Sequence, residues 1–343
     1  MNVRMLAIAS IAMLVAYGCT QSRTTMPSAA PPNQANRAAL PRQSEPALKL
    51  FGTPTKASWP DYIVAGPQHA MWFSEFYADR IGRITMDGKV REFPLPSDND
   101  IEGITIGADG NIWFTEPGAD KVGRMTPQGT VTAFSINADN PSPRGITRGP
   151  DGNVWYVEYY DGYLGRVTPK GAITRFAIPE YSSSPWAIVT GPDGDLWFTE
   201  SSANRIGRFN PSTQTFDPSV AVPTQNATPW GIIVAPDKHV WFTERNGDKI
   251  AKVLSNGKIR EFAIAQPGSY PETLAAGGDG NLWFSEMLAG NVGAIDPKTG
   301  KFGALISLPN NSIPIGIARG PNKNLWFCIS SYTNPMQIGE IVL

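Results

Sequence analysis

An eight-residue segment recurs along the chain, and its spacing constrains the fold more than any other feature of the sequence. The segment reads DGNIWFTE at 109–116, DGNVWYVE at 151–158, DGDLWFTE at 193–200 and DGNLWFSE at 279–286. Its tryptophan recurs at Trp72, Trp113, Trp155, Trp197, Trp241, Trp283 and Trp326. Successive tryptophans lie 41, 42, 42, 44, 42 and 43 residues apart. A unit of this length, repeated seven times, is typical of a β-propeller blade.

A single unit shows the strands expected within a blade. Apolar stretches cover 143–150, 154–158, 163–169 and 172–179, with the turn signals DGN and KG between them. Asp-Gly between alternating apolar residues predicts a hairpin, because both residues tolerate a positive φ. We therefore expect an all-β fold, a seven-bladed β-propeller of four-stranded antiparallel blades. The first strand of each blade should line the central channel, and the tryptophan on the second should pack between neighbouring blades.

The two ends of this domain predict how the ring closes. The seventh unit stops at 338–343, IGEIVL, before a fourth strand. The segment LKLFGTPT at 48–55 precedes the first unit and has the pattern of VREFPLPS at 90–97. We predict that 48–55 completes the last blade and covers an edge that would otherwise pair with other chains. The propeller then spans 47–343.

The first 46 residues predict export. Arg4 precedes the apolar run 5–16, which is too short for a permanent membrane span and fits a secretory signal over 1–18. The sequence AYGC at 16–19 resembles a lipobox, so we expect Cys19 to be acylated, with ordinary signal cleavage as the alternative. Residues 19–46 are rich in Ser, Pro, Gln and Ala, which predicts a disordered tether. The expected location is an outer-membrane lipoprotein, or a periplasmic or extracellular protein, with membrane contact through the lipid alone.

Charge and cysteine content narrow the partners. The net charge of −1 gives no electrostatic reason to bind nucleic acid, and we expect a monomer without a nucleic-acid partner. If Cys19 is acylated, Cys328 has no partner for an intramolecular disulfide. Cys328 lies in an apolar stretch and is predicted to be a small buried residue.

Two repeated or rare residue types could suggest chemistry, but their positions favour structural roles. The only histidines, His69 and His239, stand in the turns between first and second strands, on the face away from the loops that enter each blade. They predict neither a shared catalytic role nor a metal site. A glutamate follows six of the seven tryptophans by three residues, and we expect it to pair with loop amides or with a base on the third strand. The glutamates are Glu75, Glu116, Glu158, Glu200, Glu244 and Glu286, and the bases are Arg83, Arg124, Arg166, Arg208 and Lys252.

Function is expected where the units differ. The position at the start of each first strand, just after the usual proline, is occupied by Asp61, Glu102, Arg144, Trp186, Trp230, Glu272 and Ile315. Aromatic rings flanked by acids and a guanidinium can stack on a flat or sugar-like ligand and hold its polar groups. We therefore predict that the first six residues contact a ligand at the entry face. The alternative is that the tryptophans plug the channel mouth.

The repeat pattern PxGIxxGPDGNxWFTE…NRIGRITPxGxxxEFxLP, seen in 143–179 and 185–209, resembles the streptogramin B (virginiamycin B) lyase family. The resemblance covers roughly 47–343. It implies an enzyme that opens a cyclic depsipeptide at its ester bond by β-elimination, with a histidine base and Mg²⁺ held partly by carboxylates. The family's histidines follow the proline at the entry of the last two blades, where this chain has Glu272 and Ile315. Its metal-site acid is replaced here by Ile329 and Ser330.

Two hypotheses follow. The first is a propeller that binds a small molecule, a saccharide or a protein on its entry face. A positioned general base contributes about 10²–10⁴ in rate, so without the family's histidines the lyase reaction is not expected. The second is a metal-dependent lyase or hydrolase of altered specificity, acting on a cyclic ester or polysaccharide. In that case Glu272 is the candidate base and a divalent ion lies near Glu102 or Asp61. The cofactor is otherwise unknown, since Mg²⁺ is implied by the resemblance only.

Overall fold

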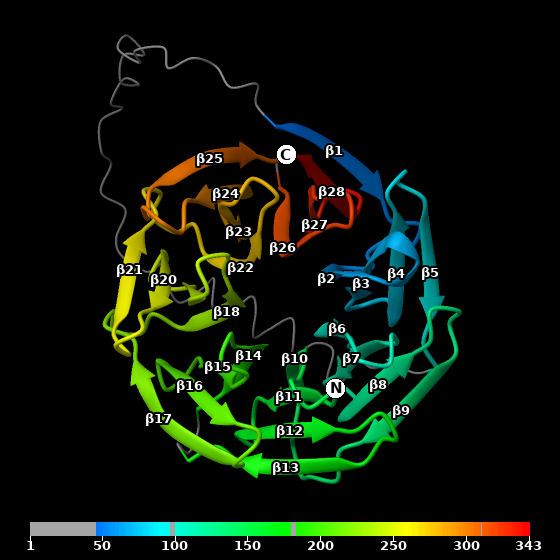
Figure 1. Cartoon of the computed structure of the whole chain (residues 1–343). Coiled ribbons are helices and arrows are strands. Elements are labelled where there is room, and N and C mark those ends of the chain that lie inside the picture. The colour runs from blue at the N-terminus through cyan, green and yellow to red at the C-terminus, as the bar shows by residue number, and fades with distance from the viewer. Residues whose placement is uncertain (1–45, 97–99, 180–182, 310) are drawn as a thin grey trace, which may run out of the picture. The chain divides into compact units, whose positions relative to one another are not determined.

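The computed structural model describes residues 46–96, 100–179, 183–309 and 311–343. The predicted signal segment 1–18, the acylation site Cys19 and the tether up to residue 45 lie outside these residues. The described chain forms seven four-stranded antiparallel sheets around a central axis (Figure 1). The predicted seven-bladed propeller is confirmed. Blades 1 to 6 consist of β2–β5, β6–β9, β10–β13, β14–β17, β18–β21 and β22–β25, and blade 7 consists of β26, β27, β28 and β1.

Each blade runs from a strand at the axis to a strand at the rim. The innermost strands are β2 (Pro60–Gly66), β6 (Ile104–Ile106), β10 (Pro143–Arg148), β14 (Pro185–Thr190), β18 (Pro229–Val234), β22 (Pro271–Ala276) and β26 (Ile313–Arg319). The second strands are β3 (Ala70–Glu75), β7 (Ile112–Glu116), β11 (Val154–Glu158), β15 (Leu196–Glu200), β19 (Val240–Glu244), β23 (Leu282–Glu286) and β27 (Leu325–Ser330).

The outer half of each blade follows the same order. The third strands are β4 (Arg80–Thr85), β8 (Lys121–Met125), β12 (Tyr163–Val167), β16 (Arg205–Asn210), β20 (Lys249–Val253), β24 (Asn291–Ile295) and β28 (Gln337–Val342). The rim strands are β5 (Val90–Pro94), β9 (Val131–Ser135), β13 (Ile173–Ala177), β17 (Thr215–Ala221), β21 (Ile259–Ala263), β25 (Phe302–Ser307) and β1 (Ala47–Gly52). A short 3₁₀ helix, η1 (Pro67–His69), forms the first turn of blade 1. No helix in the described part of the chain has the length and apolar character that a bilayer span needs.

The repeated octet builds the hairpin between the first two strands. In blade 2, Gly110 takes a φ of 73°, as this turn requires. The Asp109 carboxylate accepts hydrogen bonds from the Asn111 backbone N–H at 3.1 Å and from Trp113 Nε1 at 3.1 Å. The aspartate thus links the turn to the tryptophan four residues later.

The tryptophans pack between blades, as predicted. Trp113 of blade 2 lies in one apolar cluster with Ile146 and Tyr156 of blade 3. Trp326 of blade 7 lies in another with Ile63 and Phe73 of blade 1. Seven such clusters occur among the described residues, one at each blade junction. The tryptophan therefore holds the ring together through apolar burial.

The N-terminal strand closes the ring, as predicted. Strand β1 pairs antiparallel with β28, from Ala47 opposite Val342 to Gly52 opposite Gln337. Figure 1 shows β1, in blue, on the outside of β28, in red. Phe51 stacks on Trp326 with ring centroids 5.7 Å apart. The strand ends at Gly52, three residues before the predicted end.

The structure also locates two residues predicted to have structural roles, Cys328 and the repeated glutamate. Cys328 is completely buried, as predicted, and burial raises the pKa of its thiol. The pairing of the repeated glutamate with the third-strand base is wrong, because the register places Arg83 opposite Trp72 and places Glu75 opposite Arg80. The base lies over the tryptophan ring instead, with the Arg83 guanidinium carbon 5.9 Å from the Trp72 centroid. Where such a glutamate is paired, its partner is different, as in the 2.6 Å ion pair of Glu158 with Arg175 on the rim strand.

Candidate binding site at the entry face

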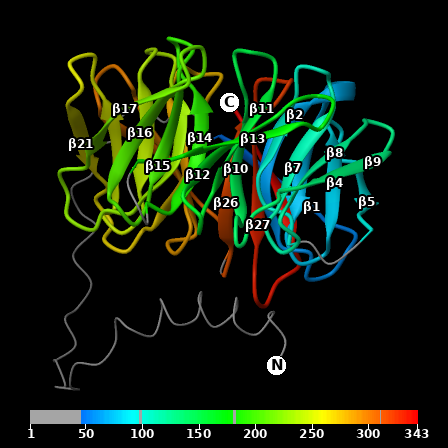
Figure 2. The ribbon, with the colours of Figure 1, turned by 90° about the horizontal axis from the view of Figure 1, so that it is seen from below.

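The loops of the propeller lie at two opposite ends of the strands (Figure 2). The chain enters each blade at one end, called here the entry face, and turns between first and second strands at the other, the turn face. The residue before the entry proline has a left-handed backbone, with φ of 56° at Trp59, 43° at Ser142, 47° at Ser184, 53° at Thr228 and 58° at Tyr270. This turn leads the chain from the rim to the channel. It brings the position after the proline to the channel mouth in each of these blades.

The structure brings the six predicted ligand contacts together at this mouth. Arg144 forms an ion pair with Glu102 of the preceding blade. Trp186 and Trp230 are stacked, with ring centroids 3.6 Å apart and planes inclined by 24°. Asp61 and Glu272 lie within electrostatic range of each other and of Glu102. The seventh position holds Ile315, an apolar side chain that is 6% exposed.

Guanidinium groups cover the outer faces of the stacked tryptophans. The Arg144 guanidinium carbon lies 5.0 Å from the Trp186 centroid, and that of Arg245 lies 3.9 Å from the Trp230 centroid. Because each indole has the other indole on one face, the guanidinium occupies the second face. Arg245 also lies over Tyr270 at 4.5 Å and pairs with Glu272 at 3.0 Å. We call this series, Arg144, Trp186, Trp230 and Arg245, the cation–π ladder.

A tyrosine bridges the mouth. Trp186 Nε1 of blade 4 donates a hydrogen bond of 3.1 Å to the Tyr62 hydroxyl of blade 1. Below this bridge lies a cavity of about 150 Å³, lined by the innermost strands and including Ile104, Ile146 and Ile188. The bridge and the ladder are the contacts that a plugged channel mouth needs. They leave Trp186 and Asp61 partly exposed.

Burial shifts the carboxyl groups of the mouth toward their neutral forms. Burial raises the pKa of Glu272 to about 7, with Arg245 opposing the rise and Glu102 adding to it. Burial, followed by repulsion from Glu102 and Glu272, raises the pKa of Asp61 well above its ordinary value against the attraction of Arg144 and Arg245. Glu272 Oε2 is buried and has no hydrogen-bond partner among the described residues. The mouth therefore holds carboxyl groups that can carry a proton near neutral pH.

These acids do not fit a divalent cation. Glu102 and Glu272 are each ion-paired with an arginine, which an added metal would have to displace. Within the described residues, no group of three or more His, Cys, Asp and Glu side chains could hold a metal ion. At the position of the family's metal-site acid, Ile329 is buried and Ser330 Oγ donates to the Pro60 carbonyl oxygen at 2.9 Å.

Sequence reasoning missed two residues that organise the mouth. Arg245 lies four residues after its repeated tryptophan, a position held in the other units by Phe76, Pro117, Tyr159, Ser201, Met287 and Ser330. Tyr62 stands where the other units have Gly, Ala or Thr. Both positions vary between units and lie on the entry face, so the comparison that selected the other six residues would have found them.

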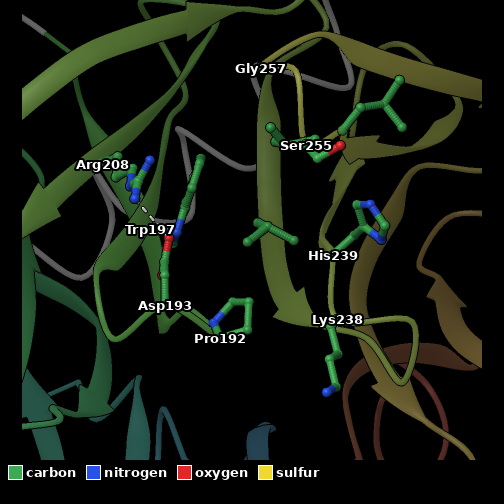
Figure 3. A pocket seen from close by; sticks show the side chains of 11 residues that line it. Pro192, Asp193, Trp197, Arg208, Lys238, His239, Ser255 and Gly257 are labelled. Atoms are coloured by element: carbon green, nitrogen blue, oxygen red, sulfur yellow. Dashed lines mark hydrogen bonds and ion pairs between the residues drawn. The ribbon is translucent and has the colours of Figure 1, made fainter.

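Both histidines lie on the turn face, as predicted. His69 ends η1, and His239 directly precedes β19. His239 lines a groove of about 280 Å³ between blades 4 and 5, together with Lys238, Trp197 and Arg208 (Figure 3). Arg208 in this groove is ion-paired with Asp193 at 2.9 Å and with Asp195 at 2.7 Å, and His239 Nδ1 lies 3.3 Å from Asp237 Oδ2.

The fold and the mouth together define a class, a seven-bladed propeller with an aromatic and charged site at its entry face. The family then follows from sequence: a profile of the Virginiamycin B lyase family matches residues 39–217 and 213–342. The chain belongs to the virginiamycin B lyase family.

Solved structures agree with this assignment. One is a catalytically inactive histidine-to-alanine variant of virginiamycin B lyase from Staphylococcus aureus, solved with quinupristin. It is 31% identical to this chain, with a TM-score of 0.81, and the match covers 87% of this chain and 100% of that one. A streptogramin B lyase is 30% identical, with a TM-score of 0.80 and coverage of 86% and 96%. Hydrazine synthase from Kuenenia stuttgartiensis shares the fold alone. It is 15% identical, with a TM-score of 0.68 and coverage of 84% of this chain and 97% of that one. No curated protein sequence matches the chain.

Proposed function

We propose that this chain is a ligand-binding member of the virginiamycin B lyase family that has lost the lyase reaction and binds a small molecule, a saccharide or a protein at its entry face. One observation carries the proposal. The two positions at which the family resemblance expects histidines are occupied by Glu272, ion-paired with Arg245 at 3.0 Å, and by Ile315, a buried apolar side chain.

The relative from Staphylococcus aureus supports this view. Replacing one histidine by alanine leaves that protein catalytically inactive. Neither His69 nor His239 can take such a role at the entry face, since both lie at turns on the opposite face. Loss of a positioned base costs about 10²–10⁴ in rate.

The mouth retains the features of a binding site. It combines aromatic surface with a few converging polar groups, which is the usual composition of a ligand site. Among the described residues Asp61 has no ion pair, and it is only partly buried. Its carboxyl group is therefore available to a ligand.

The test has a catalytic arm and a binding arm. Quinupristin incubated with the full chain should remain cyclic by mass spectrometry. In parallel, thermal shift against a panel of cyclic depsipeptides, saccharides, amines and divalent metals should identify a stabilising ligand, since a ligand at 100 times its Kd adds about 2.7 kcal/mol. Trp186→Ala and Trp230→Ala should abolish that shift. Linear quinupristin as a product, or a shift that both variants retain, would refute the proposal.

A second candidate function is favoured by Glu272 itself. A buried carboxyl group with a pKa of about 7 and one unpartnered oxygen has the protonation behaviour of a general base. Such a protein would be a lyase or hydrolase acting on a cyclic ester or a uronic-acid polysaccharide. Turnover of either substrate that Glu272→Gln abolishes would establish it. The metal-dependent form of this hypothesis draws no support from Glu102 and Glu272, which are ion-paired with Arg144 and Arg245. Product formation that EDTA stops would reinstate it.

We also propose that the protein is exported as a monomer anchored through an acylated Cys19. The support is the sequence of the first 19 residues. Cys19→Ala should move the protein from the membrane fraction to the soluble fraction and abolish its labelling by radioactive palmitate. An unlabelled wild-type protein in the soluble exported fraction would point to ordinary signal cleavage.

A further inference from the structure

Three aromatic side chains from separate loops meet on the entry face where blade 7 adjoins blade 1. Trp59 precedes β2, Tyr77 follows β3, and Tyr332 follows β27. The Trp59 centroid lies 5.5 Å from that of Tyr77 and 5.1 Å from that of Tyr332, with planes inclined by 59° and 52°. We call these three residues the Trp59 cluster. Its central ring is flanked on two sides by inclined rings.

The Trp59 cluster is unusually open for aromatic surface. Tyr332 is 74% exposed and Tyr77 is 37% exposed. Trp59 holds the left-handed position before the proline, where three other units have the small residues Ser142, Ser184 and Thr228. A bulky residue with positive φ is an outlier in protein backbones. The fold does not require an indole here, because the other units make the same turn with smaller side chains.

The Trp59 cluster differs from four other aromatic rings of the mouth in having no cation over its rings. Arginine guanidinium groups lie over Tyr159, Trp186, Trp230 and Tyr270. Within the part of the chain that the structure describes, no arginine or lysine lies over any ring of the Trp59 cluster. The electron-rich faces of these rings are therefore unoccupied by the chain's own cations.

Two acidic residues, Asp61 and Asp100, lie near the Trp59 cluster. Asp61 lies two residues after Trp59 and has no ion pair among the described residues. The pKa of Tyr77 is raised by burial first, and then by the Tyr332 phenol and the carboxylates of Asp100 and Asp61, so both carboxylates lie within electrostatic range of this ring. Burial holds the Asp61 carboxyl group toward its neutral form in the empty mouth, and a cation bound nearby would favour its ionised form. A positive ligand would then meet aromatic faces together with a carboxylate.

We propose that the Trp59 cluster binds the alkylated ammonium group of a small molecule, of the choline type, with Asp61 as its counter-charge. Aromatic rings around a cation are the usual recognition device for quaternary ammonium groups. The inference rests on the proposed function, because it names the ligand class for the same mouth.

The experiment is isothermal titration of the full chain with choline, with tetramethylammonium and with 3,3-dimethylbutan-1-ol, the neutral isostere of choline. Both cations should bind, and the neutral isostere should bind at least ~10-fold more weakly, because only the cations interact with the ring quadrupoles. Equal binding of the isostere would overturn the proposal, since it would show a merely apolar site. Binding of phosphatidylcholine vesicles without binding of soluble choline would also overturn it.

Variants locate the site. Tyr332→Leu and Asp61→Asn should each weaken choline binding at least ~10-fold, the size expected for losing a cation–π contact or a counter-charge. Tyr160→Leu is the matched control: Tyr160 is a 60% exposed tyrosine on the equivalent loop of blade 3, and its loss should leave choline affinity unchanged. Since Tyr332 is mostly exposed, its variant should also keep the wild-type melting temperature.

The outcomes separate this inference from the proposed function. If Tyr332→Leu binds choline like the wild type, or if choline does not bind, the ammonium site is refuted. A thermal shift that other ligands cause through Trp186 and Trp230 would still support the proposed function. Linearisation of quinupristin would instead refute the proposed function, whatever choline does.

Discussion

The buried Glu244 predicts that this protein loses stability as pH rises through neutrality. Glu244 ends β19 with no exposed surface, and neither carboxylate oxygen has a hydrogen-bond partner among the described residues. Burial, followed by the charge of Glu261, raises its pKa from 4.5 to about 8, while Lys249 opposes the rise. The folded protein therefore keeps this group protonated at a pH where the unfolded chain ionises it.

The magnitude follows from the two pKa values. With 4.5 in the unfolded chain and about 8 in the folded protein, the free energy of unfolding should fall by ~3.5 kcal/mol between pH 5 and pH 8 through Glu244 alone. The full contribution to stability is present below pH 4.5 and is lost as pH rises toward 8. Glu75, also completely buried and with a pKa of about 8, should add a loss of similar size.

The assay is urea unfolding of the wild type and of Glu244→Gln at pH 5 and pH 8. The amide is neutral at both values, so the variant should lose ~3.5 kcal/mol less than the wild type over this interval. Glu261→Gln is the matched variant. It removes the charge that helps raise the Glu244 pKa, so it should also reduce the pH dependence, but by less. A Glu244→Gln protein with the pH dependence of the wild type would refute the reasoning.

Three further predictions concern the scaffold and the mouth. Deleting 47–54 removes β1, the six-residue partner of β28, and should abolish the cooperative thermal transition; a cooperative transition near the wild-type Tm would show that the ring closes without it. Gly165→Ala places a Cβ 2.1 Å from the Tyr156 ring and should lower the free energy of unfolding in urea by about 1–3 kcal/mol. Gly194→Ala is the comparison variant: its Cβ meets no atom within 4 Å, but its φ is 85°, so it measures backbone strain without a clash. Arg245→Ala leaves Glu272 buried without its ion pair, so the free energy of unfolding should fall by about 3–5 kcal/mol at pH 8. The fall should be smaller at pH 5, where Glu272 is protonated. An equal fall at both pH values would show that lost packing on Trp230 dominates.

The repeat made the fold predictable to the level of single strands. A hairpin signal recurring with each tryptophan specifies the strand order within a blade, and the missing rim strand of the seventh unit specifies the partner of β28. The third-strand base was wrongly predicted as one of two possible partners of the repeated glutamate, because the count of residues does not give the register. In the antiparallel pairing of β3 with β4, Arg83 lies opposite Trp72. Glu75, three residues after Trp72, lies opposite Arg80 instead.

The candidate site was predictable only in part. Comparing one position across seven units selected six residues that the structure brings to one mouth. It could not show that Arg245 covers Trp230, or that Tyr62 bonds to Trp186 from 124 residues away, because these contacts depend on the distance across the ring. Repeats predict which face a residue occupies, and the diameter of the channel decides which of those residues touch.

Glu272 stands at a position where the family resemblance expects a histidine, and it also orders one side of the mouth. Its carboxylate holds Arg245, and Arg245 covers Trp230, so the residue that replaces a histidine also orders one end of the cation–π ladder. In blades 3 to 5, arginines of the chain therefore lie over the aromatic rings of the mouth. The Trp59 cluster lacks such a cation among the described residues and lies beside Asp61, an acid without an ion pair there. Glu272→His would therefore remove the carboxylate that holds Arg245 in the ladder, so a histidine base at this position would require further changes in the mouth.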